Sequence, residues 1–343
     1  MSPGAQSRAQ AGSERGRTGI AATSAVPVPV TSGPGRRTSV GDLIFRCLTT
    51  GFAAVVPIVL CSLLFVLLYE SSEAVRLFSW RFFTTSTWDP VAENFGVLPF
   101  IYGTLVTAFL ALLQAVPLGI GTALFLSEMA PGWVRTPVSF LVELLATIPS
   151  VIYGLWGVFV LVPWSRNYIE PALSSTLGFL PFFQGPAYGV GMLTASMILA
   201  VMTVPYITSV AQEVFRAVPT TQREAALALG ATRWEMMRMA VLPYGRTGLI
   251  GAVMLGLGRA IGETMAVTMV IGNRADISAS LFAPANTMAS VIANEFSEAS
   301  TEMYKQALIE VGLVLLLVTL TVNACARLLV WSVAGPEAAR GRT

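Results

Sequence analysis

The chain has 343 residues, of which 54% are hydrophobic and 12% charged, and its formal net charge is +2. A soluble domain carries roughly 25% charged residues, so this chain has too few polar side chains to cover a globular surface in water. It contains no histidine, which excludes Ser-His-Asp hydrolysis and histidine-ligated zinc sites. The small net charge argues against a nucleic-acid partner. Cys47, Cys61 and Cys325 lack paired spacing and are expected to be small packing residues, not metal ligands.

Six segments are long and apolar enough to cross a bilayer, for which a helix needs about 20 mostly apolar residues. Three of them contain no charged residue, and the others hold one or two. The six segments are 51–69, 99–126, 137–163, 188–212, 247–272 and 307–326. The sequence therefore predicts an all-α integral membrane protein whose six transmembrane helices form one domain, residues 47–332, surrounded by membrane lipid.

The positions of the arginines indicate the orientation of the chain, because cytoplasmic loops carry an excess of Lys and Arg. Arginines cluster before the first segment and again between the fourth and fifth segments. Six segments bring the C-terminus back to the side of the N-terminus. We therefore expect a disordered cytoplasmic tail at 1–46, which is rich in Gly, Ser, Pro and Arg, and a cytoplasmic tail at 333–343.

The loops expected outside are 70–98, 164–187 and 273–306, and none of them forms a basic funnel for an anion. An anionic solute would therefore have to be delivered. Within the second loop, residues 177–183 are expected to re-enter the membrane or to lie on it. The aromatic residues of the first loop suit a membrane interface: Phe78, Trp80, Phe82, Phe83 and Trp88.

The cytoplasmic stretch 219–243 is expected to form two short helices joined by a turn. The T-x-x-E spacing of a capping box occurs twice, at Thr221 and at Thr232. Gly230 lies between them, where a helix end commonly takes the left-handed conformation that glycine accepts. By composition alone, the stretch is also typical of an amphipathic helix resting on the membrane interface. The apolar face expected on the second helix is Trp234, Met237 and Val241.

This stretch resembles the EAA loop of ABC importer permeases, whose pattern is EAA, three residues, Gly, nine residues, Ile, one residue and Leu-Pro. The residues that match are Glu224, Ala225, Ala226, Gly230, Leu242 and Pro243. Ala240 replaces the isoleucine and removes apolar bulk from one contact. The resemblance implies a coupling helix that docks in a cleft of an ATP-binding subunit, with Glu224 making polar contacts and Gly230 setting the turn.

Arg259 and Glu263 lie four residues apart within segment 247–272, so a single helix would carry both on one face. An arginine at mid-bilayer costs about 2.5–3.5 kcal/mol on translocon scales, so it needs a compensating role. One interpretation is an intramembrane salt bridge that fixes packing. The other is an anion pathway, in which the guanidinium fork contacts a phosphate or sulfate oxyanion and Glu263 neutralises it in the empty state. Glycines on this segment would permit close helix packing or leave space beside a pore: Gly248, Gly251, Gly256, Gly258 and Gly262.

Glu143 is a third candidate for the pathway, in the first third of segment 137–163. Near a helix end, a charge is also compatible with a purely structural role. Pro149 in the same segment is expected to kink the helix and to free backbone carbonyls toward the pathway.

The segment GLGRAIGETMAV, together with ELLATIPSVIYGLWG and FGVLPFIYGTLVT, is similar to PstC-type permeases of phosphate-specific ABC importers, over about residues 42–330. The resemblance implies the type I ABC importer permease fold in a bacterial cytoplasmic (inner) membrane, with Arg259 and Glu263 taking part in phosphate passage. It also implies three kinds of partner: a second, related permease subunit that completes a heterodimer, two ATP-binding subunits and an external phosphate-binding protein. ATP and Mg would be bound by the ATP-binding subunits, and this chain would bind no cofactor.

The function expected is that of a non-catalytic permease subunit of an ATP-driven inorganic phosphate importer, forming half of the pathway. One alternative is an ABC permease for another solute, such as sulfate, molybdate or a polar organic compound. A secondary transporter would work without an ATPase. An intramembrane enzyme would need Ser/Lys or carboxylate chemistry, yet Lys305 is the only lysine in the chain.

Overall fold

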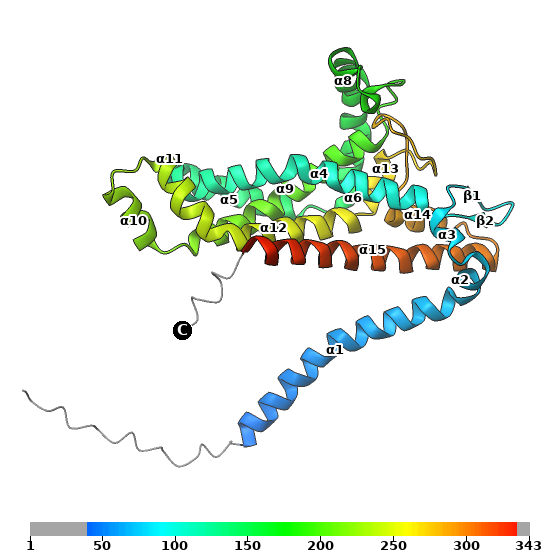
Figure 1. The fold of residues 1–343 in the computed structure, drawn as a ribbon, viewed down its shortest axis with the longest axis horizontal. Coiled ribbons are helices and arrows are strands. Elements are labelled where there is room, and N and C mark those ends of the chain that lie inside the picture. Colours follow the sequence, from blue (N-terminus) through cyan, green and yellow to red (C-terminus); the bar gives the residue numbers. More distant parts are fainter. Residues whose placement is uncertain (1–39, 335–343) are drawn as a thin grey trace, which may run out of the picture. The chain divides into compact units, whose positions relative to one another are not determined.

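The computed structural model describes residues 40–334, with side chains described to Leu328, and it is almost entirely helical (Figure 1). The sheet in this part of the chain is a short antiparallel ladder of β1 (Trp88–Asp89) and β2 (Asn94–Phe95). Five helices are long and apolar enough to cross a membrane, or up to six if one bent pair forms a single span. The expectation of an all-α membrane fold is therefore confirmed. The segments 1–39 and 335–343 of the expected tails lie outside the described residues.

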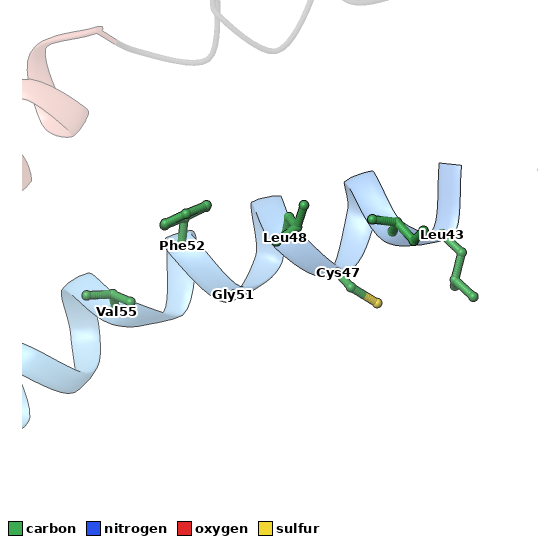
Figure 2. A pocket seen from close by; sticks show the side chains of 7 residues that line it. Leu43, Cys47, Leu48, Gly51, Phe52 and Val55 are labelled. Carbon is green, nitrogen blue, oxygen red and sulfur yellow. The ribbon is translucent and has the colours of Figure 1, made fainter. Parts of the chain in front are cut away.

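The chain divides into two compact units, and the division after Ile58 falls within α1 (Val40–Glu70). Residues 40–46, expected in the N-terminal tail, are helical instead, because the apolar residues ahead of Arg46 continue the helix toward its N-terminus. Large apolar side chains of the first unit, including Leu43, Leu48 and Phe52, are exposed and line a shallow hollow along the helix (Figure 2).

In the second unit, α4 (Leu98–Leu124) packs along α9 (Met192–Arg216), and α12 (Leu242–Gly262) lies against both. Small residues allow this packing: a Cβ added at Gly119 would lie 2.9 Å from the side chain of Ile207. The long helix α15 (Glu302–Ala334) packs against α12 and α14 (Met288–Glu295). It begins before the expected segment and includes residues 333–334 of the expected C-terminal tail.

The third predicted span is broken where a proline was expected to kink it. Helix α5 (Gly132–Thr147) meets the segment Ser150–Leu177 at an angle of 95°, and Ile148 and Pro149 between them are extended. The kink expected at Pro149 is confirmed, and the segment predicted over 137–163 is one span only if this bent pair is counted as one. After the break, α6 (Ser150–Trp156), α7 (Val162–Trp164) and α8 (Glu170–Leu177), joined by π-helical turns, rise away from the bundle (Figure 1).

The fifth predicted span also differs from the structure at both ends. It begins earlier, because α11 (Arg233–Met236) runs through a π-helical turn into α12 as one stretch, Arg233–Gly262. The helix then stops at Gly262, Glu263 is extended with ψ 128°, and α13 (Met265–Val270) follows. The carboxylate of Glu263 accepts a hydrogen bond from the backbone N–H of Ala266, so it satisfies a donor at the start of α13. That bond favours two helices over one.

The first outer loop folds into α2 (Ser72–Phe78), α3 (Arg81–Thr84) and the β1–β2 ladder. Its aromatic residues were expected at the membrane interface. Phe82 is instead fully buried in a cluster with Phe95, Phe100 and Tyr304, although Trp80 is exposed. Glu295 supports this cluster, because its carboxylate accepts hydrogen bonds from Trp88 Nε1 at 2.8 Å and from the Tyr304 hydroxyl at 2.6 Å.

Three further elements complete the described chain: a π-helical turn Phe125–Met129 after α4, α10 (Thr220–Ala228) in the coupling loop and a single 3-10 turn at Pro181–Phe183. The three cysteines are free and exposed on their helices. The packing role expected for them is therefore not seen within the described chain; Cys47 and Cys61 lie on α1, which has no buried residue.

Candidate functional site: an intramembrane arginine and the coupling loop

Arg259, near the end of α12, faces an aromatic ring and not a carboxylate. Its Cζ lies 4.2 Å from the centroid of the Tyr206 ring on α9, and its Nε is buried with no hydrogen-bond partner. A cation over an aromatic face gains about 0.5–2 kcal/mol, the larger values applying where water is excluded. The ring therefore compensates part of the charge of Arg259, and at least one of its donors, Nε, has no partner within the described chain.

Glu263 does not share a helical face with Arg259, so the expected i,i+4 pair is wrong. The chain leaves the helix at Glu263, and the ion pairs of the described residues do not include one between these two side chains. Glu263 is 9% exposed and is bonded to the Ala266 N–H. The physical reason is that the carboxylate caps the next helix, and a capping conformation is incompatible with continued α-helix.

The break in the third span frees carbonyl oxygens, as expected, and the hydroxyls of two tyrosines donate hydrogen bonds to them. The hydroxyl of Tyr206 donates to the carbonyl of Ala146 at 2.8 Å, and the hydroxyl of Tyr153 donates to that of Leu145 at 2.8 Å. Tyr153 is also within electrostatic range of both Arg259 and Tyr206. Arg259, Tyr206 and Tyr153 thus gather at the end of α5.

Neither tyrosine was identified from the sequence. The only available signal was a phenol in an otherwise apolar segment, since a buried hydroxyl needs a hydrogen-bond partner. Glu143, which was identified, is exposed on α5, and none of the ion pairs of the described residues includes it. The structure does not bring Glu143 to Arg259.

The glycines of α12 serve two different surfaces. A Cβ at Gly248 would lie 2.6 Å from Val214 Cγ2, and one at Gly256 would lie 2.9 Å from Thr203 Cγ2, so this side of the helix packs tightly on α9. The other three, at positions 251, 258 and 262, have no heavy atom within 4 Å of an added Cβ. The close helix packing expected for these glycines is therefore present on the side facing α9, and the other side is open in this chain.

The coupling loop has the expected order of helix, glycine turn and helix. Gly230 has φ +84°, between α10 and α11. The capping box of Thr232 with Glu235 is present, with the Thr232 N–H donating to the Glu235 carboxylate at 2.8 Å. The box expected at Thr221 is absent, because extended Pro219 starts the helix at Thr220, ahead of the threonine.

The residues of the EAA motif lie on an accessible surface. Glu224, Ala225 and Gly230 are exposed, as is Pro243, whereas Ala226 and Leu242 are partly buried. A hollow of about 520 Å³ lies over the loop, and Ala240, which stands in place of the motif's isoleucine, helps to line it. The other lining residues are Gln222, Ala225, Ala226, Leu229, Gly230, Ala231, Glu235 and Met239.

The apolar face of the second coupling helix differs from the expected one at Trp234, which is 61% exposed. Met237 and Val241 are buried as expected, and Met236 is buried in place of Trp234. The π-helical turn Met237–Val241 adds one residue to the helical repeat. The α-helical spacing i, i+3, i+7 therefore does not hold along the whole stretch, and Trp234 does not share the buried face.

Comparison with known proteins identifies the family. Residues 115–333 match the family model described as "Binding-protein-dependent transport system inner membrane component". The chain is 47% identical over 296 residues to the "Phosphate transport system permease protein PstC" of Mesorhizobium japonicum, covering 85% of this chain and 90% of that one. It is 48% identical over 306 residues to the protein of the same name from Xylella fastidiosa, covering 87% and 94%.

A solved bacterial alginate ABC transporter shares the fold, with a TM-score of 0.56 at 17% identity, covering 87% of this chain and 99% of that chain. These findings agree with the multi-pass helical architecture and with the non-catalytic nature of a permease subunit. The chain therefore belongs to the family of binding-protein-dependent transport inner membrane components, as a permease of the type that these relatives represent.

Proposed function

We propose that this chain is one of the two permease subunits of an ATP-driven importer of inorganic phosphate in a bacterial inner membrane. The observation that carries the proposal is Arg259, an intramembrane guanidinium that rests on Tyr206 with its Nε unbonded. Ionisable groups at such positions mark solute pathways by default. The two relatives that are 47% and 48% identical to the chain are phosphate transport system permease proteins, which supports phosphate as the solute.

The arrangement around Arg259 suits a transient contact with an oxyanion. The guanidinium offers a planar fork of donors and keeps its charge at any physiological pH. Because a ring and not a carboxylate compensates it, an arriving phosphate does not have to displace a counter-ion. A contact of this kind is weak enough to release the anion, as passage requires. Glu263 acts at the helix break, where it binds a backbone N–H at the start of α13.

The partners follow from the coupling loop and from the outer loops. Exposed Glu224 and Ala225 lie beside the hollow of the coupling loop, which suits docking of one of two ATP-binding subunits. ATP and Mg bind there and not to this chain. The second, related permease subunit supplies the other half of the pathway, and an external phosphate-binding protein delivers the anion. Both termini lie in the cytoplasm, in accord with the arginine distribution.

The test is ATP-dependent uptake of phosphate into vesicles that contain the whole complex. Arg259→Lys replaces the fork by a point charge, and we expect phosphate uptake to fall by about tenfold while the complex stays assembled. Arg274→Lys is the matched control, because Arg274 forms a surface ion pair with Asp276 in which both side chains are more than 60% exposed. Unchanged uptake by the Arg259 variant contradicts the role of this residue.

The solute is tested by competition in the same vesicles. Excess sulfate or molybdate is expected to leave phosphate uptake unchanged. If either anion is itself transported at a rate that phosphate suppresses only weakly, the chain is an ABC permease for another solute. Uptake that persists without ATP indicates a secondary transporter.

A further inference from the structure

The residue that precedes the glutamate of the EAA motif points in the opposite direction, toward the membrane domain. Nη2 of Arg223 lies 2.7 Å from Oε1 of Glu128, and Nε lies 3.2 Å from each of the two carboxylate oxygens. The side chains are 19% and 7% exposed, respectively. This is a bidentate, largely buried ion pair, the geometry in which an Arg–carboxylate contact is strongest and most directional.

The same guanidinium also reaches the end of α9. It donates from Nη2 to the carbonyl of Phe215 at 2.7 Å and from Nη1 to that of Val218 at 2.5 Å. Carbonyls at the last turn of a helix lack a full set of partners within the helix. Arg223 adds a donor to the Phe215 carbonyl, which also accepts from the Val218 N–H, and one to the carbonyl of Val218 just beyond the helix. Glu128 belongs to the π-helical turn Phe125–Met129, which ends α4. One side chain of α10 therefore contacts the ends of both α4 and α9.

Helix α10 also lies against α11 and the π-helical turn Met237–Val241, which continues into α12. None of its nine residues is buried, and Ala226 is the one apolar side chain that packs against the cluster beneath it. By contrast, α4 and α9 form the most extensively packed helix pair of the described chain. Arg223 is therefore a side chain of α10 through which a movement of that helix can reach the ends of both helices of this pair.

We propose that Arg223 and Glu128 are positioning residues that transmit the movement of the coupling helix to α4 and α9. This inference rests on the proposed function of the EAA loop and adds the route by which the loop acts. Successive residues on a helix are separated by about 100°. Glu224 consequently faces the ATP-binding subunit, and Arg223, one residue earlier, binds Glu128 of the membrane domain. Force applied at Glu224 is passed through a helix of two turns to the buried ion pair.

The experiment measures phosphate uptake and ATP hydrolysis on the same vesicles, each containing the whole complex, and takes their ratio. Arg223→Gln removes the charge and the fork, and we expect the uptake per ATP hydrolysed to fall by about tenfold, within the range known for residues that couple distant sites. Glu128→Gln is expected to lower the ratio similarly. The double variant should be no worse than Arg223→Gln alone, because that variant already removes the contact with Glu128.

The control is Arg216→Gln, which removes a cation from the same end of α9. Arg216 pairs with Glu213 at the surface, where the side chains are 54% and 74% exposed, so the ratio should stay at the unmodified value. A purely structural role for Arg223 would lower the amount of assembled complex and leave the ratio unchanged, which overturns the proposal. Should Arg223→Gln fail to assemble, Arg223→Lys keeps the charge without the fork, and an unmodified ratio for that variant overturns it equally.

Failure of the proposed function is recognised separately. It shows in the unmodified complex as an absence of phosphate uptake, and the ratio is then measured with the solute that the complex does carry. Failure of the proposed role of Arg223 and Glu128 shows only in the variants, whose ratio of uptake to ATP hydrolysis then equals that of the unmodified complex.

Discussion

The ring of Tyr206, on α9, lies 4.2 Å from the guanidinium carbon of Arg259, on α12, and takes the place at which a carboxylate was expected. The hydroxyl of the same tyrosine is bonded to Ala146, at the end of α5. One side chain therefore ties the intramembrane cation to the break in the third span. If the break moves during transport, the position of Arg259 moves with it.

Removal of the ring should impair transport more than removal of the hydroxyl. Tyr206→Phe keeps the aromatic face under Arg259, and we expect uptake within about twofold of the unmodified complex, whereas Tyr206→Leu should reduce it by about tenfold through loss of the cation–π contact. Phosphate uptake at a series of phosphate concentrations measures both variants. Tyr153→Phe is the control, because it removes a hydroxyl-to-carbonyl bond of the same kind. Equal losses for the two Tyr206 variants would assign the effect to the hydroxyl.

Neutralisation of Glu263 distinguishes a helix cap from a counter-ion. The side chain of Glu263→Gln can still accept the Ala266 N–H, so uptake should stay within about threefold of the unmodified value, since capping substitutions of this kind cost about 1 kcal/mol or less. Glu263→Ala removes the acceptor and should cause a larger loss. Phosphate uptake by the assembled complex is the measurement. A severe defect in the Gln variant would show that the negative charge itself is required.

Substitution of Gly230 should separate ATP hydrolysis from transport. At φ +84°, an L-residue is strained by roughly 1–2 kcal/mol, and a β-branched side chain by more. An added Cβ meets no heavy atom within 4 Å, so any effect arises from the backbone. We expect Gly230→Val to lower uptake per ATP hydrolysed severalfold and Gly230→Asn, which tolerates this conformation, to lower it less. Equal ratios for both variants would contradict the role of the turn.

Two glycines of α12 should respond differently to the same substitution. At Gly256 an added Cβ would lie 2.9 Å from Thr203, whereas at Gly258 it meets nothing within 4 Å. Gly256→Leu should therefore destabilise the purified complex by about 1–3 kcal/mol through overpacking, visible as a lower midpoint of thermal unfolding. Gly258→Leu should leave the midpoint unchanged and reduce phosphate uptake, because it fills the open side next to Arg259. The reverse pattern would mean that the two faces have been assigned wrongly.

Features that depend on composition and near-neighbour spacing could be predicted from the sequence. Runs of about 20 apolar residues identify spans wherever the helix is continuous, and a proline such as Pro149 within a run predicts a kink. The capping box at Thr232 is likewise local, because its partner is three residues away. The EAA residues follow a fixed spacing, and so the coupling loop could be recognised.

Contacts that join distant parts of the chain could not be predicted in this way. Arg223 and Glu128 are 95 residues apart, and nothing near either residue indicates the other. The pairing of Arg259 with Tyr206 similarly depends on how α9 and α12 pack. The break at Glu263 was missed because a carboxylate that caps the next helix has the same i,i+4 spacing as a salt bridge within one helix. Pattern alone cannot separate these two arrangements.

The bend of 95° after α5 has an electrostatic consequence for the passage of an anion. Helix α5 has 16 residues, which at 1.5 Å each gives a length of about 24 Å, less than the roughly 30 Å of hydrocarbon in a bilayer. Polar backbone at its end therefore lies within the depth of the membrane. The low-dielectric layer that a charged solute crosses on this side is correspondingly thinner, and its Born self-energy barrier is lower. A broken span would thus lower the barrier for every anion, and the role proposed for Arg259 is to add an attraction for the anion.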